Sequence, residues 1–168
     1  MINYLIIDID GTLTDGGVYY DNTGNELKKF STKDGTGIIL SRTAGIQVLI
    51  LTGRECAATF RRMTELGITE IHQGINDKAL WVKKWRNKNE IEKSEVGYIG
   101  DDINDIRPMK LCGFKACPAD AADEVKEICN YVSSVNGGEG VVRDIIKITL
   151  QNEGRWEEVL NKAYAIGV

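Results

Sequence analysis

Short apolar runs alternate along this chain with longer amphipathic segments, and few folds accommodate that alternation. We expect strands at residues 4–8, 47–51, 70–72, 97–99, 114–116 and 131–133, and helices near residues 35–44, 54–66, 76–88, 103–111, 120–129 and 140–151. Strands separated by helices of this length are typical of βαβ units, which build a parallel sheet covered on both faces. The first run, YLIID, is apolar up to its last residue, as expected of a central strand buried on both sides. The sequence therefore predicts an α/β fold, a Rossmann-like doubly wound parallel sheet.

One stretch departs from the alternation. Residues 16–30, GGVYYDNTGNELKKF, hold two short apolar runs on either side of an Asn-Thr-Gly turn signal, which predicts a β-hairpin flap. The intervals 11–51 and 79–100 are too short for an inserted cap domain beside their expected elements. We therefore expect residues 1–168 to form a single domain, with a C-terminal tail at about residues 152–168. In that tail, Trp156, Val159, Leu160 and Ala163 recur at helical spacing and form an apolar stripe.

Charge and apolar run length exclude several kinds of partner. Lys and Arg number 21 against 25 Asp and Glu, a formal net charge of −4, which disfavours a nucleic acid partner because such binding depends on neutralised phosphates. No apolar run reaches the roughly 18 residues that a membrane-spanning helix needs. Asp8 interrupts the N-terminal apolar run too early for a signal peptide. We expect no membrane association and a cytoplasmic location.

The supply of metal-binding and nucleophilic side chains is narrow. The four cysteines, at positions 56, 112, 117 and 129, form no CxxC pair, so we expect small buried side chains in a reducing compartment. The single histidine, His72, excludes a histidine-rich zinc site, and we expect it to end a strand with a local hydrogen bond. Carboxylates, Lys, Thr and Ser must therefore supply the chemistry.

Candidate functional residues gather where the expected strands end. Ligands of a doubly wound sheet bind outside the carboxyl ends of its strands. The residues there are Asp8 and Asp10 after the first strand, Thr52, Gly53 and Arg54 after the second, Lys78 after the third, and Asp101, Asp102 and Asp105 after the fourth. Asp8 and Asp10 can face the same cleft only if the chain leaves strand geometry, and Gly11 permits that.

Carboxylates crowded at one edge repel one another unless a cation lies among them. Because all the candidate ligands are hard oxygens, we expect Mg²⁺ rather than zinc or copper. The same set suits phosphoryl transfer: one Asp can act as nucleophile, a second can protonate the leaving oxygen, and Thr, Lys and backbone N–H groups can hold the phosphoryl oxygens.

Each residue also has a plainer interpretation. Asp8 and Asp10 alone fit a solvated turn, Thr52 a helix N-cap, and Lys78 a surface lysine. The GGEG segment at residues 137–140 lacks the GxxxxGK[ST] pattern and is expected to be a mobile turn before a helix rather than a phosphate cradle.

The motifs DIDGTLTDG, LTGR, the lysine of NDKAL and GDDINDIRPM occur in order, and together they resemble the haloacid dehalogenase superfamily of phosphohydrolases. They bracket residues 8–105, and the similarity continues through NGGEGVVRD to about residue 150. The chain further resembles a capless subfamily, the 3-deoxy-D-manno-octulosonate 8-phosphate phosphatases and their relatives acting on nine-carbon sugar-acid 9-phosphates. The segment LTDGGVYYDNTGNELKKFSTKDGTGI, the absence of a cap and GGEGVVRD point to this subfamily.

The resemblance implies a role for each residue of the catalytic set. Asp8 would be the nucleophile and a metal ligand, and Asp10 the general acid and base, with its backbone carbonyl also on Mg²⁺. Thr52 and the N–H of Gly53 would bind the phosphoryl group. Lys78 would neutralise Asp8 and the transferring oxygens.

The resemblance also implies the remaining roles. Asp101 would complete the metal site, Asp102 would support it from behind, and Asp105 would orient Lys78. Arg54 could reach a substrate carboxylate with a bidentate contact. An arginine there favours the eight-carbon substrate, whereas NDKAL and Glu139, where we expect an arginine, depart from that pattern.

Three expectations follow for function. The first is a Mg²⁺-dependent phosphatase for a 2-keto-3-deoxy sugar-acid phosphate, 3-deoxy-D-manno-octulosonate 8-phosphate by preference, which would serve lipopolysaccharide synthesis. The alternatives are a nine-carbon 9-phosphate phosphatase, or a non-catalytic assembly module like the tail of some acylneuraminate cytidylyltransferases. The relatives imply a homotetramer in which hairpins meet and tails reach a neighbour's active site, although the tail's apolar stripe equally fits packing on its own domain.

Overall fold

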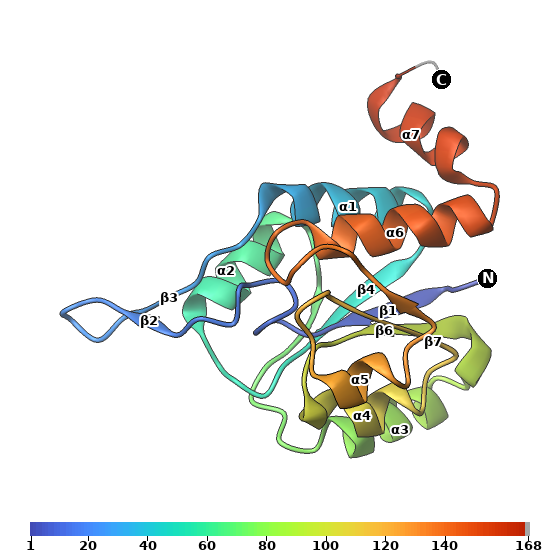
Figure 1. Cartoon of the computed structure of the whole chain (residues 1–168). Helices are drawn as coiled ribbons and strands as arrows, with labels where there is room; N and C mark the ends of the chain where they lie inside the picture. The colour runs from blue at the N-terminus through green and yellow to red at the C-terminus, as the bar shows by residue number, and fades with distance from the viewer. Residues whose placement is uncertain (167–168) are drawn as a thin grey trace.

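Residues 1–166, described by a computed structural model, contain a six-stranded parallel sheet (Figure 1). The strand order is β5-β4-β1-β6-β7-β8. The strands are β1 (Tyr4–Ile7), β4 (Gln47–Leu51), β5 (Glu70–His72), β6 (Val96–Ile99), β7 (Phe114–Cys117) and β8 (Tyr131–Val132). β1 pairs with both β4 and β6, so the chain builds outward on one side of β1 and then on the other. The predicted doubly wound sheet is confirmed, and the strand order reverses beside β1, where ligands bind in such folds.

Helices cover both faces of the sheet (Figure 1). The helices are α1 (Thr32–Thr43), α2 (Ala57–Glu65), α3 (Lys78–Lys88), α4 (Ile103–Met109), α5 (Asp123–Lys126), α6 (Val141–Asn152) and α7 (Trp156–Tyr164), with a 3₁₀ turn at Lys93–Glu95. Leu5 and Ile7 of β1 join the core under α1, α2 and α6, whereas Ile6 joins the core under α3, α4 and α5. This alternation explains why β1 reads as continuously apolar. α5 is much shorter than the helix expected at 120–129.

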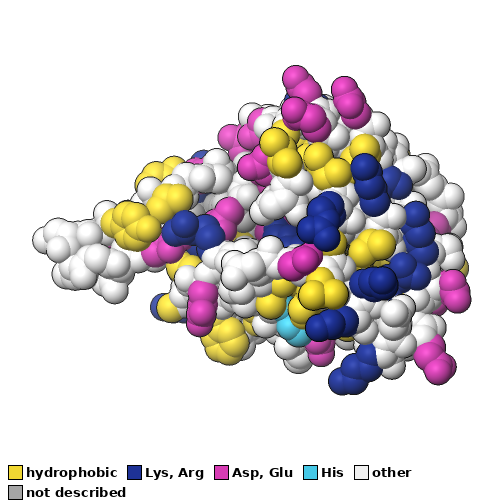
Figure 2. Space-filling view, turned by 90° about the horizontal axis from the view of Figure 1, so that it is seen from below, with side chains coloured by type: hydrophobic (Ala, Val, Ile, Leu, Met, Phe, Trp, Pro, Cys, Tyr) yellow, Lys and Arg dark blue, Asp and Glu magenta, His cyan; other side chains and the backbone are white. Residues whose placement is uncertain are grey.

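The predicted hairpin is present and projects from the sheet (Figure 1). β2 (Tyr19–Tyr20) pairs antiparallel with β3 (Glu26–Leu27). Between β1 and β4, the described chain holds this hairpin and α1, and no cap domain. Figure 2 shows yellow hydrophobic side chains on the projecting hairpin, where Val18, Tyr19, Tyr20 and Leu27 are all exposed.

The C-terminal helix α7 packs on its own chain. Val159 is buried in the core under α1 and α6, and Trp156, Leu160 and Ala163 pack against that core. Figure 1 places α7 and the hairpin at opposite sides of the molecule, so this tail does not cover its own chain's strand ends. Docking of the tail on a neighbouring subunit stays a prediction, and residues 167–168 of that tail lie outside the described part.

Two smaller predictions concern the cysteines and the histidine. The four cysteines are free, and Cys56, Cys112 and Cys117 are buried as expected, whereas Cys129 is half-buried. His72 ends β5 and its Nε2 lies 3.0 Å from Oε2 of Glu70. Among residues 1–166, no helix combines the length and apolar character needed to cross a bilayer.

Candidate active site

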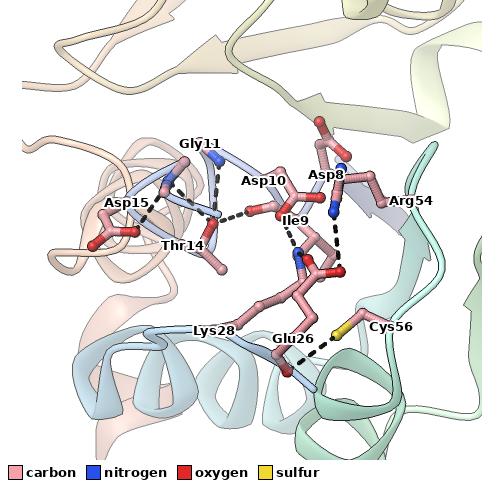
Figure 3. A network of polar contacts seen from close by, with 12 residues as sticks. Asp8, Ile9, Asp10, Gly11, Thr14, Asp15, Glu26, Lys28, Arg54 and Cys56 are labelled. Atoms are coloured by element: carbon pink, nitrogen blue, oxygen red, sulfur yellow. Dashed lines mark hydrogen bonds and ion pairs between the residues drawn. The ribbon is translucent and has the colours of Figure 1, made fainter. Parts of the chain in front are cut away.

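The loop after β1 brings Asp8 and Asp10 to the carboxyl edge of the sheet (Figure 3). The carbonyl oxygen of Ile9 accepts hydrogen bonds from the N–H groups of Thr12, Leu13 and Thr14 at 2.9–3.2 Å, which turns the chain sharply. Gly11 has a φ of +87°, a conformation that side chains disfavour. The predicted departure from strand geometry is confirmed.

Gly11 also lets Asp101 approach this loop. A Cβ at position 11 would lie 2.0 Å from Oδ2 of Asp101, so any side chain there would displace the carboxylate. The hydroxyl of Thr12 donates a 2.9 Å hydrogen bond to Oδ1 of Asp101. These contacts join the ends of β1 and β6.

Lys78, the first residue of α3, lies between two buried carboxylates. Its Nζ is 2.9 Å from Oδ1 of Asp8 and 2.8 Å from Oδ1 of Asp105. Burial disfavours the ammonium, but the two carboxylates outweigh it and raise the pKa of Lys78 above its ordinary value. Oδ1 of Asp105 also accepts a 2.7 Å hydrogen bond from the hydroxyl of Tyr98, so Lys78 is held by a fixed partner.

The carboxylates of Asp8, Asp101 and Asp105 crowd one another. One oxygen of each lies within 4.8 Å of the other two. Burial, together with the Asp105 carboxylate, raises the pKa of Asp8 well above its ordinary range, while Lys78 opposes this. Burial and Asp105 likewise raise the pKa of Asp101 to about 7. Neighbouring negative charges without enough positive charge between them favour a cation at this position.

The donor set fits a magnesium ion. Asp105 is occupied, because its oxygens accept hydrogen bonds from Lys78, Tyr98 and the N–H groups of Asp101 and Asp102. Asp8 and Asp101 are therefore the carboxylates available to a hard cation, and no nitrogen or sulfur ligand stands among the residues of this cluster.

Thr52, Gly53 and Arg54 follow β4 at the same edge. They line a cavity of about 170 Å³ together with Asp8, Asp10, Lys78, Asp102 and Asn104. Thr52 is buried and its N–H donates to the carbonyl oxygen of His72, whereas α2 begins only after Cys56. The alternative in which Thr52 caps a helix is therefore wrong. Binding sites for drug-sized ligands occupy roughly 300 Å³ or more, so this cavity suits a phosphoryl group and not a whole sugar acid.

The structure separates Asp102 from the other carboxylates. Its side chain is exposed and accepts a hydrogen bond from the N–H of Ile103 at the start of α4. Asp102 lines the cavity and lies outside the cluster of Asp8, Asp101 and Asp105, but its charge contributes to the raised pKa of Asp101.

The glycines at 137 and 138 pack beneath the Asp8–Asp10 loop. A Cβ on Gly137 would lie 1.9 Å from the carbonyl oxygen of Gly11, and the N–H of Gly138 donates to the carbonyl of Thr12 at 3.0 Å. The expected turn before a helix is confirmed, because residues 137–140 form a turn that leads into α6, and close backbone contacts pack that turn against the loop after β1. Glu139 lines a separate cavity beside Lys33, Arg143 and Trp156.

Two hairpin residues at the site escape sequence reasoning. Figure 3 shows Lys28 reaching Asp10, and Glu26 lying between Lys28 and Arg54. Burial opposes the charge of Lys28, but Asp10 and Glu26 outweigh it and raise its pKa. The charged residues of the segment NELKK were the only available signal, and such residues are typical of any exposed strand.

Comparisons with known proteins agree with this arrangement. Residues 66–145 match the family model described as haloacid dehalogenase-like hydrolase. The 3-deoxy-D-manno-octulosonate 8-phosphate phosphatase of Escherichia coli K12 is 37% identical over 157 residues, which cover 94% of this chain and 84% of that protein.

Solved structures of similar proteins superpose closely. The 3-deoxy-D-manno-octulosonate 8-phosphate phosphatase of Moraxella catarrhalis, in complex with magnesium ion, phosphate ion and KDO, has a TM-score of 0.90 and 33% identity, covering 95% of this chain and 91% of that one. The cobalt-bound phosphatase of Haemophilus influenzae has a TM-score of 0.87 and 35% identity, covering 92% and 91% of the two chains.

Proposed function

The chain belongs to the haloacid dehalogenase-like hydrolases, within the group of the 3-deoxy-D-manno-octulosonate 8-phosphate phosphatases, and we propose that it hydrolyses that sugar-acid phosphate with Mg²⁺. As a member of this group it is a phosphoric monoester hydrolase. The observation that carries the proposal is the buried arrangement of Asp8, Lys78 and Asp101. Lys78 lies 2.9 Å from Asp8, and Asp101 joins the same cluster from the neighbouring strand.

The reaction proceeds in two steps on Asp8. A carboxylate oxygen of Asp8 attacks phosphorus, the bond from phosphorus to the sugar oxygen breaks, and Asp10 gives its proton to that oxygen. Asp10 then takes a proton from water, whose oxygen attacks the aspartyl-phosphate and releases inorganic phosphate. Lys78, Thr52 and the N–H of Gly53 bind the phosphoryl oxygens as charge develops on them.

The carboxylates of Asp8 and Asp101, with the backbone carbonyl of Asp10, would hold Mg²⁺. When bound, the ion neutralises the crowded carboxylates and draws charge from the phosphoryl oxygens. Asp105 fixes Lys78, and Asp102 caps the N-terminus of α4 beside the cavity.

The eight-carbon substrate is supported by Arg54 and by the named relatives. Arg54 lines the rim of the cavity, where a guanidinium could pair with a substrate carboxylate. The cavity accommodates the phosphoryl group, so the sugar would extend toward the hairpin. A nine-carbon 9-phosphate remains the alternative substrate, and a non-catalytic assembly module the alternative function.

Assembly and location complete the proposal. The exposed apolar side chains of the hairpin support a homotetramer in which hairpins meet, and the neighbouring tails would then cover the sites. Such an enzyme would act in the cytoplasm.

The test measures Mg²⁺-dependent phosphate release from octulosonate 8-phosphate, nine-carbon 9-phosphates, and several hexose and nucleotide phosphates. Wild type should prefer one 2-keto-3-deoxy acid phosphate. Asp8→Asn should lower kcat/KM by a factor on the order of 10⁴ or more, because the nucleophile is lost. Asp123→Asn, an exposed carboxylate on α5, is the matched control and should keep wild-type activity.

The outcomes separate the alternatives. If the enzyme prefers a nine-carbon 9-phosphate, the assignment of the eight-carbon substrate is wrong, but the proposed mechanism is unaffected. Silence of folded wild-type protein on the whole panel would favour the assembly module.

A further inference from the structure

The side chain of Lys28 is buried in a hairpin whose tip and apolar side chains are exposed. Its side chain is 1% exposed, and its Nζ contacts Oδ1 of Asp10 and lies 3.1 Å from Oε1 of Glu26. Burying an ammonium is costly unless ion pairs compensate, and shorter side chains would suffice to close a hairpin against a loop. We therefore ask what the buried Lys28 ammonium does for Asp10, its partner in the active site.

The two oxygens of the Asp10 carboxyl group differ in their hydrogen bonding. Oδ1 is engaged by Lys28, whereas Oδ2 is buried and has no hydrogen-bond partner among the described residues. Asp10 lines the same cavity as Asp8 and Lys78. An unpaired buried oxygen costs free energy in the free protein, and a ligand that bonds to it recovers that cost.

Lys28 is itself held in place. Glu26 lies between Lys28 and Arg54, with its Oε2 3.0 Å from Nη2 of Arg54. Glu26 is paired with Tyr20 across the hairpin, and the Tyr20 hydroxyl lies 3.4 Å from the same Nη2. Glu26 therefore helps to hold the Lys28 ammonium at Asp10 (Figure 3).

We propose that Lys28 is a positioning residue for the reaction, which holds the Asp10 carboxyl group by Oδ1 so that Oδ2 meets the leaving oxygen of the substrate. This inference rests on the proposed function, in which Asp10 protonates that oxygen. Through Lys28 the hairpin, which has no catalytic group of its own, sets the geometry of the general acid. A misplaced acid slows proton transfer steeply, since catalysis depends on hydrogen-bond reach.

The test exploits the need for protonation. An alkyl phosphate such as the sugar-acid phosphate expels a strongly basic alkoxide and depends on the acid, whereas 4-nitrophenyl phosphate expels a stable phenolate and does not. The value of kcat/KM reports the steps up to leaving-group release, so later hydrolysis of the aspartyl-phosphate does not affect it.

Lys28→Met, which keeps most of the length of the side chain without its charge, should lower kcat/KM about 100-fold for the alkyl phosphate. The loss for 4-nitrophenyl phosphate should stay below about threefold, and Asp10→Asn should show the same selectivity. Lys29→Met is the matched control, because the neighbouring Lys29 side chain is 62% exposed, and it should leave both values unchanged. Lys28→Arg, which keeps the charge, should recover part of the alkyl activity.

An equal loss on both substrates, or no loss in Lys28→Met, would overturn the positioning role while the proposed function stands. If wild type hydrolyses neither substrate, both proposals fail. If Lys28→Met does not fold by circular dichroism, Lys28→Arg carries the same comparison, with a smaller loss still confined to the alkyl phosphate.

Discussion

The carboxyl groups of Asp8 and Asp101, at the ends of two strands, lie close to another carboxylate, which destabilises the folded protein when they are ionised. Burial and the nearby Asp105 carboxylate disfavour the charged forms of both groups. Among residues 1–166, Lys78 alone supplies a positive charge within 3 Å of Asp8. The metal-free protein therefore carries an electrostatic cost that a divalent cation relieves.

This cost predicts the pH dependence of the metal-free protein's stability. The folded-state pKa of Asp101, about 7, lies above its unfolded value, so the stabilising contribution is complete at low pH and is lost as pH rises through 7. With EDTA, thermal denaturation should give a lower Tm at pH 8 than at pH 6, and each such carboxyl group contributes at most about 1.4 kcal/mol per pH unit.

Asp101→Asn should flatten this dependence and abolish the rise in Tm that Mg²⁺ produces at pH 8. Asp123→Asn should behave as wild type. If the Tm of the wild-type protein in EDTA does not fall between pH 6 and pH 8, the pKa of Asp101 is not raised as stated.

At the scale of elements, a side chain of α1 caps the N-terminus of α6. Asp34 of α1 is buried, and its carboxylate accepts hydrogen bonds from the N–H groups of Gly140, Val142 and Arg143 at 2.8–3.3 Å. N–H groups at the start of a helix have no acceptor within the helix itself, so the Asp34 carboxylate supplies one for α6. Asp34 therefore caps a helix more than a hundred residues away and positions the Gly137–Gly138 turn that packs under the Asp8–Asp10 loop.

Asp34→Ala should lower the free energy of unfolding by about 2 kcal/mol, because the buried N–H groups of α6 lose their acceptor. Urea denaturation followed by circular dichroism measures this. Asp123→Ala, at an exposed helix position, should change stability by less than about 0.5 kcal/mol. Equal stability of the two variants would show that solvent or neighbouring groups cap α6 instead.

Over the whole molecule, the hairpin and α7 lie at opposite sides (Figure 1). The cavity at the strand ends is small, at about 170 Å³. Leu27 is 53% exposed on the hairpin, beside other exposed apolar side chains. Apolar surface gathered on a projecting element is typical of an interface. A second chain meeting this hairpin would add walls that one chain lacks.

Light scattering at micromolar concentration should therefore give about four times the chain mass of 18.6 kDa. Leu27→Asp should lower the mass without loss of secondary structure, because a carboxylate cannot be buried there cheaply. Phe60→Asp, at an exposed apolar position on α2, should leave the mass unchanged. A monomeric mass for the wild-type protein would contradict the proposed homotetramer.

The order of the motifs along the chain is enough to predict the sheet and most of the site. Parallel strands end at one edge, so Asp8, Asp10, Thr52, Lys78 and Asp101 must meet there once the alternation of elements is recognised. Local chemistry suffices equally for the turn at Gly11 and for the hairpin.

Tertiary structure alone decided the contacts whose partners are distant and whose residue types are common. A lysine in a polar hairpin looks solvated, and only the folding of the hairpin against the Asp8–Asp10 loop buries Lys28 on Asp10. Likewise, only the close approach of two backbones explains why Gly137 lies against Gly11. The physical reason is that burial depends on the whole packed chain, whereas periodicity and spacing report only what neighbouring residues impose.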